Sequence, residues 1–267
     1  MGRAFFLLVL AAIALLVPSA CVAATGSSAN YEAPPLLTGN IYQKGSEPPR
    51  LLFKFRRTAS SVGSTTRVLR EYNTPDGSAA ARERVVYQNG QLLSCELEEL
   101  QTGATGIVAL RPNPQNTEQQ KWFFTWTARP GARAVTNSEV PAKDVLVNDM
   151  IPGFMLSHWD ALMTGSTIKF RFIVFQRAET VGFKLVKESE SSWHGRPVVL
   201  IKMQPTSMVI ARLVEPVYFT VEKGGEHRIL QYVGRTTPMI KRGNKWEDLD
   251  AVNVFDWKPL STNATAP

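Results

Sequence analysis

The stretch NDMIPGFMLSHWDALMTGSTIKFRFIVFQRAETVGFKLVK, residues 148–187, decides the fold that we predict for this chain. Its first part has a helical pattern, because apolar residues at spacings of three and four share one helix face. These residues are Ile151, Phe154, Met155, Trp159 and Leu162. Asn148 or Asp149 is expected to cap the start of this helix, and Gly165 is expected to end it.

Two predicted strands follow the helix and are separated by a short charged turn. Residues 168–174 place apolar side chains at every second position, which is the period of a strand with one buried face. Arg177 and Glu179 flank the turn, and residues 181–185 repeat the alternation. A short helix packed beside a long antiparallel hairpin is expected at the centre of a curved sheet.

Short strands separated by turn residues continue on both sides of this stretch. Asn89-Gly90 and Gly224-Gly225 lie between alternating segments, and each dipeptide predicts a β-hairpin. Only one good helical pattern occurs among many strand patterns. The chain is therefore predicted to be mainly β: a curved antiparallel sheet, forming a half-barrel or open barrel, with one short helix packed on it.

Three segments interrupt the strand pattern. Residues 112–119 are predicted to form a loop, and residues 137–149 lead into the helix with little pattern. Residues 207–214 fit either a helical turn or a strand. Gly234 precedes Arg235 in a strand pattern, which indicates a bulge or a close backbone approach, although a strand-end turn is the favoured alternative.

The first residues have the features of a secretory signal peptide. Arg3 forms a basic n-region, residues 4–17 form an apolar h-region, and Pro18 precedes a run of small side chains. The apolar run is shorter than the ~20 residues that a membrane-spanning helix needs. We therefore predict a signal peptide over residues 1–24 and an exported protein of the periplasm or cell envelope.

Two processing sites are compatible with this signal peptide. Val22-Ala23-Ala24 fits a general signal peptidase site, whose cleavage would release a soluble protein. Ser19-Ala20-Cys21 resembles the end of a lipoprotein lipobox, in which Cys21 would carry the lipid. In either case Cys95 has no partner for a disulfide, and we expect it to be a small core residue.

The rest of the chain divides into three segments. Residues 25–37 are polar and contain prolines, so a linker or loosely attached arm is expected there. Residues 38–257 carry the strand patterns and are predicted to form a single β-rich domain. Residues 258–267 are polar, and a disordered tail is expected. No stretch after the signal peptide is long and apolar enough for a transmembrane span.

The formal net charge of the chain is +7, and the basic residues are spread along the predicted strands. No nucleic-acid-binding motif accompanies them, so nucleic acid is not expected as a partner. Outside the cytoplasm a basic surface attracts lipid or other anionic envelope components, such as lipopolysaccharide or acidic glycans. Peripheral or lipid-anchored contact with a membrane would follow. A solvated basic surface without a specific partner explains the charge equally well.

No recognised catalytic or metal-binding spacing occurs in the sequence. Ser157 and His158 are adjacent, and neighbouring side chains on a helix point in different directions, so they are not expected to form a catalytic pair. His158, His194 and His227 are too far apart for a zinc motif. Phosphate-binding glycine loops are missing as well. We therefore expect no metal and no cofactor, and a non-catalytic protein is favoured over an enzyme.

The residues of the central stretch that are best suited to ligand binding are polar or aromatic: His158, Trp159, Arg171, Arg177 and Glu179. An arginine at the mouth of a concave sheet could grip a carboxylate or phosphate through its forked donors. The alternative is cross-strand ion pairing on a solvated face, which needs no ligand.

The order of these features resembles that of exported bacterial half-barrel envelope proteins, such as periplasmic lipoprotein carriers and outer-membrane lipoprotein receptors. After the signal peptide and the first strands, Asp149-Met150-Ile151-Pro152 leads into a helix containing Trp159-Asp160-x-Leu162. The late segments Glu215-Pro216-Val217-Tyr218-Phe219 and Leu230-Gln231-Tyr232-x-Gly234 are similar in style to late strands of such proteins. The resemblance implies a curved sheet that wraps an apolar cavity for acyl chains.

These observations favour an exported, non-catalytic cell-envelope protein that binds an amphipathic or lipid-like ligand in a concave sheet. Two alternatives remain open. One is a hydrolase that acts on an envelope polymer. The other is a structural scaffold without a small ligand.

Overall fold

The structure is a computed structural model that describes residues 34–257. The predicted signal peptide with Cys21 and the predicted tail over 258–267 lie outside the described residues. The predicted arm over 25–37 lies outside them except for its last residues, which belong to the sheet. Leu36 begins the first strand, and the carbonyl oxygen of Pro35 accepts a hydrogen bond from the amide of Ala59 in the next strand.

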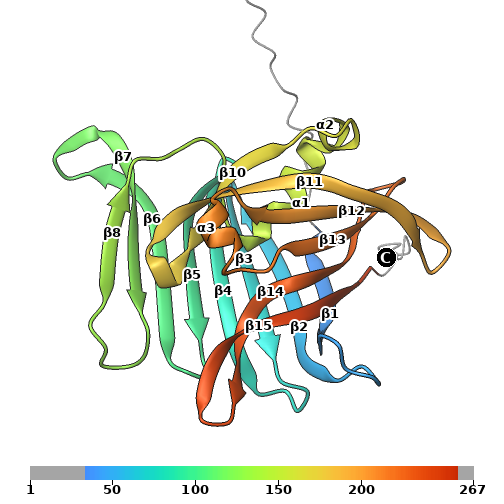
Figure 1. Cartoon of the computed structure of the whole chain (residues 1–267). Coiled ribbons are helices and arrows are strands. Elements are labelled where there is room, and N and C mark those ends of the chain that lie inside the picture. Colours follow the sequence, from blue (N-terminus) through green and yellow to red (C-terminus); the bar gives the residue numbers. More distant parts are fainter. Residues whose placement is uncertain (1–33, 258–267) are drawn as a thin grey trace, which may run out of the picture.

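Fifteen strands form one sheet (Figure 1). They are β1 Leu36–Gln43, β2 Leu51–Val62, β3 Thr65–Asn73, β4 Ala79–Gln88, β5 Gln91–Glu99, β6 Ala104–Asn113, β7 Asn116–Thr127, β8 Val135–Glu139, β9 Val145–Leu146, β10 Ile168–Val174, β11 Glu179–Trp193, β12 Arg196–Pro205, β13 Val217–Glu222, β14 Ile229–Arg242 and β15 Lys245–Asp256. Strands that follow one another in the sequence pair with each other, except that β8 and β9 do not pair and form the two ends of the sheet. In addition, β1 pairs with β15.

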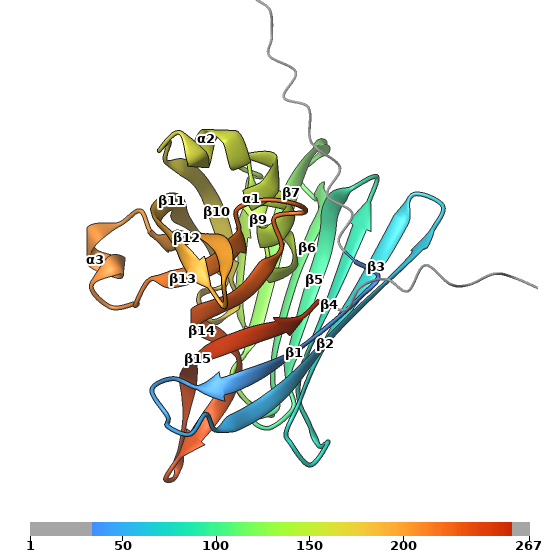
Figure 2. The same cartoon turned by 90° about the vertical axis from the view of Figure 1, so that its right-hand side faces the viewer.

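The sheet bends around β1 and β15, so that β2–β7 form one wall and β10–β14 face it (Figure 2). The helices η1 Asn148–Met150, α1 Ile151–Ser157 and α2 Trp159–Met163 lie between the walls at one end. The prediction of a mainly β protein with a curved, unclosed sheet is therefore confirmed. The sheet is mixed, because β9 pairs with β10 in parallel while the other pairs are antiparallel.

Two hairpins show why particular dipeptides fix the strand register. Asn89 and Gly90 both have positive φ, as the tight turn between β4 and β5 requires, and this hairpin was predicted. His194 and Gly195 form the same kind of turn between β11 and β12. That second turn lets β11 run from Glu179 to Trp193, well beyond the strand predicted to end near residue 185.

Two segments differ from the sequence prediction, and a third adopts one of the two structures that the sequence allowed. The predicted loop over 112–119 is mostly strand, because β6 and β7 continue to a tight turn after Asn113. The weakly patterned segment 137–149 contains the end of β8 and the whole of β9. Within residues 207–214 the chain forms a short helix, α3 Met208–Ala211.

The favoured interpretation of Gly234 as a strand-end turn is wrong, because Gly234 lies inside β14 and closely approaches a neighbouring strand, as the other interpretation had it. Its φ is +143°, and a Cβ there would lie 2.9 Å from Cγ2 of Val217 and 3.0 Å from its Cα. The β14–β15 register shifts shortly afterwards, between Thr236 and Ile240, as expected of a bulge. Glycine is therefore required at this position both by the backbone and by the neighbouring strand.

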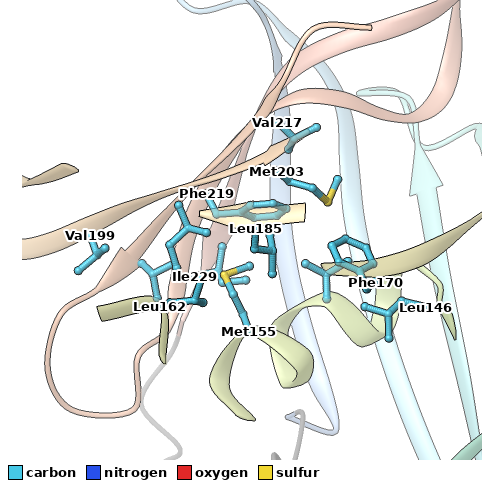
Figure 3. Packing of buried hydrophobic residues seen from close by; sticks show 13 residues of the cluster. Leu146, Met155, Leu162, Phe170, Leu185, Val199, Met203, Val217, Phe219 and Ile229 are labelled. Carbon is cyan, nitrogen blue, oxygen red and sulfur yellow. The ribbon is translucent and has the colours of Figure 1, made fainter. Parts of the chain in front are cut away.

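The helices pack on the wall of β10–β14 through a cluster of buried apolar side chains. Met155 of α1 and Leu162 of α2 are almost fully buried there. Figure 3 shows Met155 pointing toward Leu185 and Phe219, and Phe170 lying close to Leu146. A second cluster lies inside β3–β7 and contains Cys95, whose burial raises the pKa of its thiol. Cys95 is thus an inert core residue.

Candidate functional site

A cavity of ≈ 80 Å³ lies on the concave side of the sheet, where β1–β3 and β13–β15 meet the start of α1. Its wall is largely apolar, with side chains from both halves of the sheet: Leu37, Phe55, Ile151, Pro152, Met203, Val217, Phe219, Ile229, Tyr232 and Phe255. The polar side chains that line it are Arg57, Arg70, Asn148, Asp149 and Arg235. The cavity therefore combines an apolar surface with three guanidinium groups and one carboxylate.

Arg57 and Asp149 form a buried, two-pronged ion pair in this cavity. Phe53, Phe55 and Arg57 occupy successive inward positions of β2, so the strand period carries the arginine into the interior. Arg57 Nε lies 2.6 Å from Asp149 Oδ1, and Nη2 lies 3.1 Å from Oδ2. The hydroxyl of Tyr87 also donates to Oδ2 at 2.9 Å.

The protonation of Asp149 follows from these contacts. Burial alone would raise the pKa of this carboxyl, but the hydrogen bonds and the charge of Arg57 outweigh burial and hold the pKa below its ordinary value. Burial next to the same carboxylate raises the pKa of Tyr87. Asp149 is consequently an anion that accepts hydrogen bonds at both oxygens, with no free oxygen to act as a base.

A second buried ion pair joins β3 and β4. Arg70 Nη1 lies 2.6 Å from Glu83 Oε2, and the other carboxylate oxygen accepts from Asn148 Nδ2 and Thr237 Oγ1, each at 3.1 Å. The guanidinium carbon of Arg70 also lies 5.3 Å from the ring centre of Phe55, within cation–π range. Glu83 thus links β3 and β4 to the helix start and to the bulge of β14.

Arg70 lines the cavity and retains donors that have no partner among the described residues. Among residues 34–257, its Nε and Nη2 groups donate no hydrogen bond to another residue. Arg57 differs, because Nη1 donates to the carbonyl oxygen of Pro34 at 2.7 Å and its other nitrogens hold Asp149. Arg70 therefore has more free donors for an additional anion than Arg57 has.

Glu99 is a further buried carboxyl next to this polar centre, although it does not line the cavity. Its Oε2 accepts a hydrogen bond from the amide of Met239 at 3.3 Å. Burial is the main reason that its pKa is raised to about 7, and the nearby negative charge of Glu83 adds to the effect. Glu99 therefore titrates close to neutral pH.

The residues selected from sequence occupy two other places. Arg171 Nε donates to Thr180 Oγ1 at 2.6 Å, and exposed Arg177 pairs with Glu179 at the β10–β11 turn. His158 lies at the junction of α1 and α2. None of these four residues lines the cavity.

Trp159, the fifth selected residue, is half-buried and stacks on His227 with ring centres 4.1 Å apart. Its ring packs at the edge of the cluster between the helices and β10–β14. Trp159 also lies outside the cavity lining, and it belongs to a different part of the molecule from the arginines of the β10–β11 turn.

The expectation that Ser157 and His158 do not meet is wrong. The helix is interrupted at His158, where φ is −116° and ψ is 17°, and this break brings Ser157 Oγ to 3.0 Å from His158 Nδ1. Both groups also lie 2.9 Å from the carbonyl oxygen of Phe154. A carbonyl only accepts hydrogen bonds, so the tautomer with its proton on Nδ1 satisfies the contact with Phe154, and in that tautomer Nδ1 cannot accept a proton from Ser157. These contacts lie at the carboxyl end of α1.

Sequence reasoning missed the polar centre of Arg57, Arg70, Glu83 and Asp149. The available signal was a charged residue at an inward position of an alternating strand. Val68, Arg70 and Tyr72 illustrate it on β3, where the arginine occupies a position that the period assigns to the core. Such a charge is expected to be paired, since an isolated buried charge is costly.

Within residues 34–257, no group of three or more His, Cys, Asp or Glu side chains has the arrangement of a metal site. Over the same residues, no helix has the length and apolar character needed to cross a membrane. No protein-family model, curated protein or solved structure matches the chain.

Proposed function

We propose that the protein is an exported, non-catalytic cell-envelope protein that binds an amphipathic anion in its concave sheet. The observation that carries this proposal is the cavity, in which Arg70 presents free donors beside an apolar wall. The signal-peptide pattern over residues 1–24 supports export, and the resemblance to half-barrel carriers of acyl chains agrees with an amphipathic ligand.

The charged head of the ligand would bind at Arg70, next to Arg57. A guanidinium presents donors in a planar fork that fits a carboxylate or phosphate, and such bonds are stronger away from water. The alternative position at Arg171 and Arg177 is less suitable. Arg171 already donates to Thr180, and Arg177 is paired with Glu179 on an exposed turn.

The apolar part of the ligand would lie against β13, β14 and β15. Val217, Phe219, Ile229 and Phe255 supply that wall. The cavity of ≈ 80 Å³ is smaller than the ~150 Å³ that accommodates a benzene molecule. A chain of lipid length would therefore extend past Pro34 and Trp257, which line the same cavity, or displace side chains of α1.

The carboxylates of this centre argue against hydrolysis of a polymer. Asp149 is the one carboxylate, among the residues described, that lines the cavity. Both of its oxygens are held by Arg57 and Tyr87. A glycosidase needs two carboxyl groups that flank the reacting bond, one as acid and one as base or nucleophile. A binding site uses Asp149 only to position Arg57.

Native mass spectrometry of protein purified from the cells that produce it tests the proposal. A bound amphipathic anion that is released on denaturation is the expected result. Calorimetric titration of the emptied protein with decyl phosphate and with decanoate then measures affinity and distinguishes a phosphate from a carboxylate head. If no molecule co-purifies and neither probe binds, the scaffold alternative replaces the binding function.

A matched pair of variants locates the site. Arg70→Lys keeps a positive charge beside Glu83 but removes the fork, and we expect an affinity loss of about ten-fold or more. Arg177→Gln removes an exposed arginine outside the cavity and should leave affinity unchanged. A loss in Arg177→Gln without a loss in Arg70→Lys would indicate attraction by overall charge and would contradict binding in the cavity.

A further inference from the structure

The helix α3, Met208–Ala211, forms a compact protrusion between β12 and β13 (Figure 2). Ser207 Oγ accepts from the amide of Ile210, and the amides of Leu213 and Val214 donate to the carbonyl oxygen of Ile210. The protrusion is anchored at its base, because the Thr206 amide donates to Gly182 O at 2.9 Å. It therefore presents its side chains from a hydrogen-bonded turn fixed to β11.

Three large apolar side chains of this protrusion face solvent. Met208, Val209 and Leu213 are 76%, 71% and 79% exposed. Other large apolar residues with similar exposure, such as Val62 and Val140, stand in separate parts of the chain. Single exposed apolar residues are ordinary on a protein surface, whereas several together at a protruding tip indicate a contact with an apolar phase or partner.

Positive charges without a counter-ion lie around the same protrusion. Arg212 directly follows α3, and Lys184 on β11 lies opposite Gln204, near the end of the strand that leads into α3. Lys169 on β10 lies opposite Lys184. Within residues 34–257 none of these three forms a salt bridge. The nearest acidic residue along the chain, Glu215, is paired with Lys44 at 2.5 Å. Unpaired positive charges therefore lie within the protrusion and on the strands at its base.

We infer that α3 is a membrane-docking element, which inserts Met208, Val209 and Leu213 into the surface of an anionic lipid bilayer. The apolar side chains enter the interface between headgroups and acyl chains, and Arg212, Lys169 and Lys184 contact anionic headgroups. The formal net charge, +7 for the full chain and +6 after loss of Arg3 with the signal peptide, adds attraction over a longer range. This inference does not depend on the cavity, which is lined by other residues.

Vesicle sedimentation tests the apolar contact, with the chain from residue 25 onward, which contains every residue of the described fold. Vesicles that contain phosphatidylglycerol should bind the protein more strongly than vesicles of phosphatidylcholine alone. Val209→Asp and Leu213→Asp should each reduce the partition coefficient by roughly ten-fold. Val62→Asp is the matched control, because Val62 is 75% exposed but lies at the β2–β3 turn, and it should bind as the parent does.

Charge variants and the oligomeric state complete the test. Lys169→Gln combined with Lys184→Gln should weaken binding to the anionic vesicles, and Lys245→Gln in the β14–β15 hairpin should not. The inference is overturned if vesicles do not bind the protein, or if Val62→Asp weakens binding as much as the α3 variants do. It is also overturned if sedimentation velocity shows a dimer that Leu213→Asp dissociates, since α3 would then contact a second copy.

Discussion

Asp149→Ala should cost about 3–5 kcal/mol of unfolding free energy, as the loss of one partner from a buried ion pair does. The variant removes the acceptors of two Arg57 donors, at 2.6 and 3.1 Å, and of the Tyr87 hydroxyl at 2.9 Å. Arg57 is only 6% exposed, so its charge would be left largely shielded from bulk water. The Pro34 carbonyl oxygen would remain as its single neutral acceptor.

Urea unfolding followed by tryptophan fluorescence measures this loss. Glu179→Ala is the matched control, because it removes the partner of exposed Arg177 and should cost less than about 1 kcal/mol. Replacing both members of the buried pair with leucine should cost less than Asp149→Ala alone, since no unpaired charge is left inside. A loss below about 1 kcal/mol for Asp149→Ala would refute the assignment of a buried, structurally required pair.

The same pair has a defined dependence on pH. The pKa of Asp149 is lowered in the fold, so its contribution to stability is complete above the unfolded value, about 3.9. That contribution is lost as the pH falls through the lower folded value. The free energies of unfolding of the parent and of Asp149→Ala should therefore converge below about pH 4. A constant difference down to pH 2 would contradict this sign.

Three further predictions concern Glu99, Gly234 and the chain start. The folded pKa of Glu99 is raised to about 7, so its ionisation destabilises the fold as the pH rises from the unfolded pKa toward 7. The change in unfolding free energy caused by Glu99→Gln, measured by urea titration, should therefore be more stabilising at pH 8 than at pH 5 by about 1–3 kcal/mol. An equal change at both pH values would contradict this prediction. Gly234→Ala should lower the unfolding free energy by about 2–4 kcal/mol, because Gly234 has φ +143° and lies close to Val217. Gly224→Ala, which has open space around it, should lower the unfolding free energy by less than about 1 kcal/mol, and equal losses in the two variants would contradict this prediction. The intact mass of the exported protein should show that the chain is cleaved before residue 25. A diacylglycerol group on Cys21 would favour the lipoprotein alternative, and an exported protein that still contains residues 1–17 would refute the predicted signal peptide.

Local sequence patterns predicted the parts of the fold that depend on neighbouring residues. Asn89-Gly90 identified a hairpin because the turn needs positive φ at both positions. Met155 and Leu162 were assigned to the core by helical spacing, and both are buried there. The curvature of the sheet was predicted from many short strands with a single helix.

Contacts between distant residues were not predictable in this way. Arg57 and Asp149 are 92 positions apart, so the inward position of Arg57 on β2 indicates a buried charge but does not identify its partner. The two-residue strand β9 is too short to show a period, and it is held by parallel pairing with β10. The helix break at His158 likewise has no Gly or Pro at its position to signal it.

The pairing of β1 with β15 constrains how the chain can reach its native state. The first strand of the fold obtains one of its two neighbours only from the last, with Thr38 opposite Asp256. A chain that emerges from its amino end must therefore keep the outer edge of β1 unpaired until the final strand arrives. Such a high contact order slows folding and prolongs exposure of that edge. A truncation before β15 would leave β1 and β14 as open edges, and would favour aggregation over a smaller folded unit.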